Sequence, residues 1–446
     1  MALSRKVQTD NQPSSSHTAN DGLQARLIAL HLLNEVLQRK KALDDVIKSD
    51  ADYNALSGLD RGFARMLAAT TLRRMGQIDA VLLKAMDQGE YPKPQRLHDV
   101  LRIGLTQIFF MDVPDHAAVD TTVRLAREKQ RGFVNAVMRR MTAEGREWIK
   151  DTDESLNIPA WLYSQWMRDY GADAALSIAR ASLSEASLDI TVKIEDETMI
   201  WAGTLEASKL SGTTIRRAAG GRVENLSGFE QGAWWVQDAS AALPARLFGD
   251  VRGQHVIDMC CAPGGKTMQL AAMGANVTAV DRSATRMKKV HENLDRLGLS
   301  PQVETIVSDG SIWQPKEPSH FVLLDAPCTA TGTIRRHPDI LHLKEENDQM
   351  RLIDIQARLL RNAAQIVQSG GTLIYCTCSL QKEESEYQIE AFLSDNADFT
   401  IDPINSGEIG GAKDAIDKHG FARILPFHMA ARGGMDGFFI ARLRKS

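Results

Sequence analysis

The second half of the chain alternates short apolar runs with helical segments, and this rhythm constrains the fold more than any other feature. Helical segments such as residues 284–297 and 347–368 lie between runs rich in Val, Ile and Leu. Such alternation predicts a doubly wound, mostly parallel sheet that binds ligands beyond the carboxyl ends of its strands. The predicted strands are QHVIDM (254–259), NVTAVD (276–281), VETIVSD (303–309), HFVLLD (320–325), GTLIYCT (371–377) and, at the C-terminus, DGFFIARL (436–443).

The chain has 446 residues, too many for one compact core, so we expect several domains. Residues 1–21 are polar and predict a disordered N-terminus. Apolar residues recur at helical spacing through residues 22–145, which predicts an all-α domain. Residues 146–230 are mixed and predict a small α+β subdomain or a linker, and residues 231–446 form the α/β domain.

The composition, 43% hydrophobic and 25% charged, is typical of a soluble globular protein. No apolar run approaches the roughly 20 residues that span a bilayer, and the N-terminus lacks the apolar core of a signal peptide. We therefore expect a cytoplasmic protein without membrane contact.

A net charge of −4 does not by itself suggest nucleic acid, but it hides a local basic run. Such a run is usually a solvated helical face, and it indicates RNA binding only if the rest of the chain agrees. Its basic residues, interrupted by the acidic Glu128, are Arg124, Arg127, Lys129, Arg131, Arg139 and Arg140.

All five cysteines follow residue 259. An odd number in a cytoplasmic chain argues against a disulfide framework. Cys376 and Cys378 are one residue apart, which is the wrong spacing for a C-x-x-C zinc motif, and no histidine cluster accompanies them. We expect no metal.

The first predicted strand runs into a Gly-Gly turn, Asp258–Thr267. An ATP-binding P-loop would need Gly where Cys260 stands, and Pro263 has no N–H for a phosphate; the dinucleotide motif G-x-G-x-x-G is absent. S-adenosylmethionine needs a close backbone turn and an acid for its ribose. Asp281 and Asp309 end the next two strands, so the sequence predicts this cofactor.

The fourth and fifth strands end in a carboxylate and two thiols: Asp325 and Cys328, then Cys378. This combination suits methylation at C5 of cytosine, a carbon that becomes nucleophilic only after a thiolate adds to C6. Asp325 could hold or supply a proton at N3, and the second thiol or a bound water could later remove the C5 proton. Cys260, Cys261 and Cys376 are by contrast expected to be inert packing.

Together, DMCCAPGGKT, VLLDAPCTATGTIRRHPDI and IYCTCSLQKEE resemble the RNA 5-methylcytosine methyltransferase family, most closely its bacterial 16S rRNA members. DRGFARMLAATTLRR (60–74), LRIGLTQIFFMDVPDHAAVDTTVRLA (101–126) and GFVNAVMRR (132–140) are similar to the antitermination factor NusB, an all-α RNA-binding fold. The resemblance implies a NusB-like all-α N-terminal domain, a small α+β subdomain and a Rossmann-like class I methyltransferase domain.

Carried over to this sequence, the resemblance implies that Cys378 is the nucleophile, that Cys328 assists product release and that Asp325 serves both cofactor and base. Arg335, Arg336 and His337 would bind substrate RNA near the active site, and the basic run would bind rRNA phosphates. The residues implied to line the cofactor site are Cys260, Cys261, Ala262, Pro263, Gly264, Gly265, Lys266, Asp281, Asp309 and Asp325.

Two positions depart from the family pattern: the family often has Ala at position 261 and commonly Ser or Ala at position 376, and both are Cys here. The expected partner is 16S rRNA, naked or in an early assembly intermediate, bound by a monomer. Two alternatives stay open. One is the same reaction on transfer RNA or another RNA, and the other is a non-catalytic RNA-binding or antitermination module.

Overall fold

The computed structural model describes residues 18–86, 89–410 and 412–446. The chain forms two compact units, the first ending at Asp153 and the second running from Glu154 to Ser446. Residues 1–17 of the predicted disordered N-terminus lie outside the described residues, and helix α1 begins at Thr18, before the expected end of that segment.

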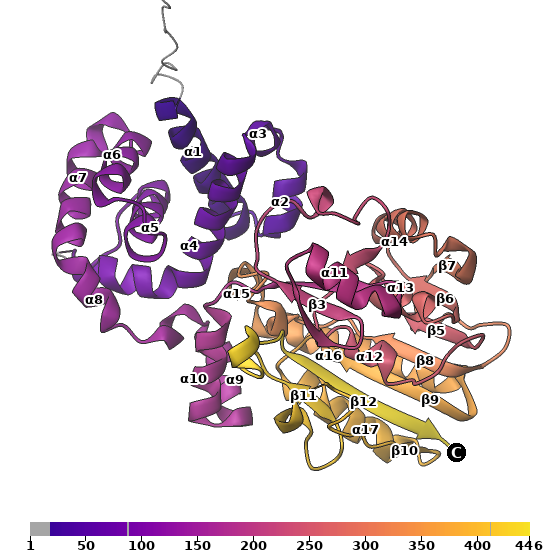
Figure 1. The fold of residues 1–446 in the computed structure, drawn as a ribbon. Helices are drawn as coiled ribbons and strands as arrows, with labels where there is room; N and C mark the ends of the chain where they lie inside the picture. Colours follow the sequence, from indigo (N-terminus) through magenta and orange to yellow (C-terminus); the bar gives the residue numbers. More distant parts are fainter. Residues whose placement is uncertain (1–17, 87–88, 411) are drawn as a thin grey trace, which may run out of the picture. The chain divides into compact units, whose positions relative to one another are not determined.

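The first unit is helical throughout its described residues, as the apolar spacing predicts (Figure 1). Its core forms where α1 packs on α4 and α5, through side chains such as Leu32, Leu67 and Leu101, which are fully buried. None of the described helices of the chain reaches the length and apolarity that crossing a bilayer requires. The helices of this unit are α1 (Thr18–Leu37), α2 (Leu43–Ser49), α3 (Ala51–Ala55), α4 (Gly58–Lys84), α5 (Gln95–Phe110), α6 (Asp115–Leu125), α7 (Arg131–Arg140) and α8 (Arg146–Lys150).

The second unit opens with two helices, α9 (Ala160–Tyr170) and α10 (Ala172–Ser182), followed by a small antiparallel sheet. The strand order is β2-β3-β1-β4, and α11 (Thr198–Thr204) packs against β2 and β3. Three strands of this sheet lie in residues 146–230, the stretch that the sequence left open between a subdomain and a linker, and the fourth lies just beyond it. Its strands are β1 (Leu188–Val192), β2 (Ser208–Ser211), β3 (Thr214–Arg217) and β4 (Trp234–Val236).

The large sheet has the order β10-β12-β9-β8-β5-β6-β7, with β11 paired to β12. Strands β7, β6, β5, β8 and β9 are parallel, whereas β12 is antiparallel to β9. The predicted Rossmann-like domain is confirmed, and the two short strands β10 and β11 were not foreseen. The strands are β5 (His255–Met259), β6 (Asn276–Asp281), β7 (Val303–Val307), β8 (Ser319–Asp325), β9 (Val367–Thr377), β10 (Phe399–Ile401), β11 (Ala422–Ile424) and β12 (Phe438–Lys445).

Helices cover both faces of this sheet, because successive strand side chains point to opposite sides. In β5, Val256 belongs to the core cluster that includes residues of α13 and α14, whereas its neighbour Ile257 belongs to the cluster that includes residues of α16 and α17. In Figure 1 strands β8, β9 and β12 lie side by side. The helices are α12 (Leu243–Arg246), α13 (Gly265–Ala272), α14 (Ala284–Leu297), α15 (Ile340–Leu343), α16 (Glu346–Ile366) and α17 (Glu386–Asp395).

Candidate active site

The loop between β5 and α13 folds back over the neighbouring strand. The backbone N–H of Cys261 donates to the carbonyl of Val280 at 3.1 Å, and that of Gly264 donates to the carbonyl of Cys261 at 2.8 Å. Gly264 has a φ of +99°, and a Cβ there would lie 3.2 Å from a methyl group of Val290, so glycine suits this position best. Gly265 then begins helix α13. The result is a tight backbone turn at the carboxyl edge of the sheet.

The two carboxylates predicted for the cofactor end adjacent strands but differ in their surroundings. Asp281 is buried and accepts hydrogen bonds from the backbone N–H groups of Ala262 at 3.1 Å and Ser283 at 2.8 Å, which braces the loop. Asp309 is exposed, and hydrogen bonds from the backbone and hydroxyl of Ser311 lower the pKa of its carboxyl. Asp309 is therefore an ionised group facing solvent.

Lys266, the second residue of α13, reaches across to the end of β8. Its ammonium lies 2.7 Å from Asp325 Oδ2 and 5.0 Å from the ring centroid of Phe438. Burial lowers the pKa of Lys266, but Asp325, together with Cys376 and Asp258, more than offsets it and the net pKa is raised. The ammonium therefore stays charged and orients the Asp325 carboxylate.

The two predicted reactive thiols are neighbours. The Sγ atoms of Cys328 and Cys378 lie 3.4 Å apart, and both residues are partly exposed. The parallel register of β8 and β9, which pairs Asp325 with Cys376, places the two following segments at one edge. The hydrogen bond to Cys378, together with burial, raises the pKa of Cys328 well above its ordinary value. Cys328 is therefore a protonated thiol next to Cys378.

The other three cysteines are held apart from this pair. Cys376 is fully buried, and its thiol donates to Asp325 Oδ1 at 3.6 Å. Burial, reinforced by Asp325, raises the pKa of Cys376 well above its ordinary value. Burial likewise raises the pKa of Cys260 and Cys261, with Asp258 and Asp281 nearby. These thiols stay protonated, which disfavours them as nucleophiles.

The arginines after Cys328 make hydrogen bonds and ion pairs within the domain. Arg335 is 3% exposed and donates to the carbonyl of Gly433. Arg336 donates to Asp238 at 2.6 Å and to Asp436 at 2.7 Å, and it lies 3.8 Å from Asp189. The predicted contact of these two arginines with RNA stays a prediction; in this structure Arg335 is buried, and the half-buried Arg336 is paired with carboxylates.

His337 follows these arginines and is half-buried, and its backbone N–H donates to the carbonyl of Thr333 at 2.9 Å. Its predicted contact with RNA stays a prediction. In the helical unit, by contrast, every side chain of the basic run is exposed, together with Phe133, which is 43% exposed on α7. Arg140 is also held locally, since it donates to the carbonyl of Ala85 at 3.0 Å.

Sequence reasoning missed two buried carboxylates at this edge. Asp258 begins the first motif and accepts a hydrogen bond from the Thr267 hydroxyl at 2.5 Å, and burial raises its pKa to about 7. Glu384 is fully buried behind the two cysteine segments. The only sequence signal for either was its place inside a motif, DMCCAPGGKT or IYCTCSLQKEE. The described residues contain no group of three or more His, Cys, Asp or Glu placed to hold a metal ion.

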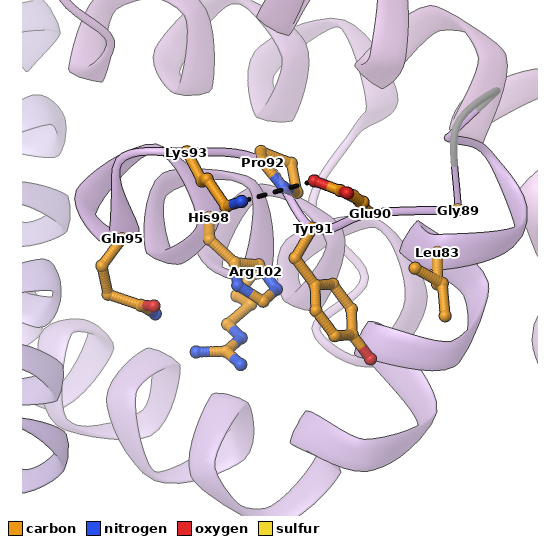
Figure 2. A pocket seen from close by; sticks show the side chains of 9 residues that line it. All are labelled: Leu83, Gly89, Glu90, Tyr91, Pro92, Lys93, Gln95, His98 and Arg102. Carbon is orange, nitrogen blue, oxygen red and sulfur yellow. Dashed lines mark hydrogen bonds and ion pairs between the residues drawn. The ribbon is translucent and has the colours of Figure 1, made fainter.

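A pocket of about 530 Å³ lies in the helical unit and was also not foreseen. Figure 2 shows Tyr91, His98 and Arg102 among its lining side chains. Tyr91 stacks on His98 with ring centroids 4.7 Å apart, and both His98 and Arg102 bind Asp79. Because these polar groups are occupied by one another, we assign no ligand to this pocket.

Comparison with known proteins agrees with this geometry. Residues 247–444 match the family model described as 16S rRNA methyltransferase RsmB/F, and residues 23–143 match the NusB family. The Ribosomal RNA small subunit methyltransferase B of Cronobacter sakazakii is 32% identical over 444 residues, covering 94% of this chain and 98% of the relative. The corresponding protein of Shigella sonnei is 31% identical over 440 residues, with 94% and 98% covered.

Solved structures share the fold. The crystal structure of PH0851 superposes with a TM-score of 0.73 at 24% identity, covering 95% of this chain and 98% of that chain. A methyltransferase homolog protein from Pyrococcus horikoshii gives a TM-score of 0.55 at 25% identity, covering 66% of this chain and 98% of that one. The chain therefore belongs to the 16S rRNA methyltransferase RsmB/F family, whose members are S-adenosylmethionine-dependent rRNA methyltransferases, and it carries a NusB-family domain before the catalytic domain.

Proposed function

We propose that this chain methylates C5 of a cytosine in 16S rRNA through a transient covalent bond between Cys378 Sγ and cytosine C6. The observation that carries the proposal is the pair of thiols 3.4 Å apart, one of them held protonated. The two thiols follow the paired strands β8 and β9, and Asp325 lies at the end of β8, where Lys266 orients its carboxylate. A methyltransferase acting on an already nucleophilic amine would need neither thiol.

The residues around the glycine turn fit the cofactor that the family implies. Gly264 permits the left-handed backbone of the turn, Asp281 lies beneath the turn, and the exposed Asp309 follows the next strand. Asp258 Oδ1 is buried without a hydrogen-bond partner among the described residues, as suits a site that meets a cationic ligand. Asp281 and Asp309 would hold the ribose and adenine sides, respectively. When bound, S-adenosylmethionine supplies the electrophilic methyl group on its sulfonium.

The protein's own groups would then divide the work. Cys378, as thiolate, forms the Sγ–C6 bond, and the electron pair of the C5–C6 double bond moves toward the ring, where a proton at N3 stabilises it. Solvent would supply the N3 proton, and the carboxylate of Asp325, 31% exposed and oriented by Lys266, would accept a hydrogen bond from N3–H. After methyl transfer the C5 proton must leave so that the C5–C6 double bond re-forms and Cys378 is expelled. Cys328 starts as a protonated thiol, so it would pass its proton to Cys378 Sγ as that sulfur is expelled and take up the C5 proton in its place; a bound water is the alternative acceptor.

The helical unit supports 16S rRNA as the substrate. Its exposed basic residues would neutralise RNA phosphates, and Phe133 among them offers a ring for stacking on an unpaired base. The relatives named for the small ribosomal subunit match this unit as well as the catalytic domain, since they cover 94% of the chain. The alternative substrate is another RNA, on which the same active site would carry out the same reaction.

The test combines substrate mapping with two cysteine variants. Bisulfite sequencing of 16S rRNA from cells with and without the gene should reveal one protected cytosine that depends on the gene. Cys378→Ala should abolish methylation while calorimetry still detects S-adenosylmethionine binding. Cys328→Ala should accumulate a protein–RNA adduct that survives a denaturing gel. Retained methylation in Cys378→Ala would sink the nucleophile assignment, and loss in Cys376→Ala alone would reassign it.

A further inference from the structure

A buried carboxylate lies directly behind the two reactive cysteines. Glu384 is the last residue of a short 3-10 helix, η8 (Lys382–Glu384), and its side chain is fully buried. One oxygen, Oε1, accepts from the backbone N–H of Thr329 at 3.0 Å and from Gln356 Nε2 at 3.0 Å. The other, Oε2, accepts from the hydroxyls of Thr329 at 2.5 Å and Ser379 at 2.6 Å. Four donors thus converge on one carboxylate.

Three of the four donor groups belong to the sequence neighbours of the cysteines. Thr329 immediately follows Cys328, and Ser379 immediately follows Cys378. Gln356, on α16, also donates to the carbonyl of Pro327 at 2.9 Å, so the backbone on both sides of Cys328 is held by this network. A single carboxylate therefore cross-links two segments that are about fifty residues apart in the chain.

This arrangement is unusual for a group that only stabilises the fold. A buried carboxylate is costly unless it is fully hydrogen-bonded or paired with a cation. Two residues later, Glu386 is paired with a cation: it forms an ion pair with Arg423 at 2.5 Å. The four donors to Glu384 are neutral instead, and each is attached to a segment that carries or contacts a reactive cysteine.

We propose that Glu384 is a positioning residue that sets the spacing between the Cys328 and Cys378 thiols. The 3.4 Å separation of their Sγ atoms follows from the hydrogen bonds that draw the two segments onto one carboxylate. The consequence for methylation rests on the proposed function, whereas the spacing of the thiols does not. The two can therefore be tested separately.

The first experiment measures thiol spacing without RNA. Diamide takes two electrons and two protons from a pair of thiols and leaves a disulfide. Peptide mapping then measures how fast the disulfide between Cys328 and Cys378 forms, which we call closure. Glu384→Gln replaces one acceptor oxygen with an NH2 group, so a donor faces the N–H and O–H donors of Thr329, Gln356 or Ser379 and their hydrogen bonds are lost. We expect closure in Glu384→Gln to slow by about tenfold or more. The matched control is Glu390→Gln, the same change at an exposed position of α17, which should close as fast as the wild type.

The second experiment measures catalysis. In Glu384→Gln, kcat for methylation should fall about 10- to 100-fold, while KM for S-adenosylmethionine changes less than about twofold. Glu384→Asp keeps the charge and should recover part of both rates. If Glu384→Gln fails to fold, Ser379→Ala removes one donor and should slow closure by a smaller factor.

Each outcome decides the matter. The proposed spacing role would be overturned if diamide formed no Cys328–Cys378 disulfide in the wild type. It would also be overturned if Glu384→Gln or Ser379→Ala formed this disulfide at the wild-type rate. A fall in kcat with normal closure would also overturn it, because Glu384 would then act by another route. If the wild type closes and Glu384→Gln slows closure, but no variant or wild type methylates rRNA, the positioning role survives and the proposed function fails.

Discussion

Replacing Gly332 with alanine should disable the active site without touching a reacting group. Gly332 lies four residues after Cys328, in a turn where its N–H donates to the carbonyl of Cys378 at 2.9 Å. Its own carbonyl accepts from the N–H of Gly437 at 2.8 Å. Three backbone segments therefore meet at this residue, and one of them carries the proposed nucleophile.

The size of the effect follows from the distances. An alanine Cβ at position 332 would lie 2.6 Å from the carbonyl carbon of Gly437, nearer still to its oxygen, and 2.8 Å from the carbonyl oxygen of Cys378. Cβ atoms essentially never come within 3.0 Å of another heavy atom, so backbone must move. Each of the two hydrogen bonds that weakens costs ~1–3 kcal/mol. A displacement of Cys378 approaching about 1 Å would lower kcat by about 100-fold.

The assay is methylation of 16S rRNA under saturating S-adenosylmethionine, alongside denaturant unfolding. Gly203→Ala is the matched control, because Gly203 is exposed in α11 and a Cβ there meets nothing within 4 Å. That variant should keep full activity and gain up to ~1 kcal/mol of stability. A Gly332→Ala enzyme with wild-type kcat and unfolding free energy would refute the reasoning.

Three further predictions follow from charged residues of the two units. Burial raises the pKa of Asp258 to about 7, above its unfolded value of about 4, so its contribution to stability is present at low pH and is lost as pH rises through that window. Relative to wild type, Asp258→Asn should therefore gain ~1–4 kcal/mol in unfolding free energy between pH 4 and pH 8, and parallel pH profiles would contradict this. Lys266→Met should cost ~2–4 kcal/mol in urea unfolding, because it leaves Asp325 without its cation; a loss under ~0.5 kcal/mol would show that solvent screens the pair. Arg336→Met should lower the unfolding free energy and leave the salt dependence of RNA binding unchanged. Arg127→Ala should instead reduce the slope of the logarithm of RNA affinity against the logarithm of salt concentration by about one. The reverse result would show that Arg336 contacts RNA.

Local sequence pattern was sufficient for the layout of the catalytic domain. The strand predicted at 276–281 and the helix predicted at 284–297 have the bounds of β6 and α14. Apolar period and turn residues are properties of short segments, so they can be read without knowing the partners. The three-residue strands β10 and β11 escaped notice because three residues are too few to show a period.

Burial could not be predicted in the same way. Arg335 and Arg336 had the composition of an RNA-binding segment, yet Arg335 is buried and Arg336 is paired with carboxylates. The carboxylates that pair with Arg336 come from β1, from the segment after β4 and from the segment before β12, each about one hundred residues or more away in sequence. A charge pattern shows which group is present, but its partners depend on long-range packing.

The cysteines show the same division. Their residue type and their positions after two predicted strands made Cys328 and Cys378 candidates from sequence alone. The tertiary structure decided which thiols meet, because the β8–β9 register and the hydrogen bonds to Glu384 bring these two within 3.4 Å and turn Cys376 toward Asp325. Sequence determines which side chains end each strand, whereas the spacing between strand ends is set by contacts between residues far apart in the chain.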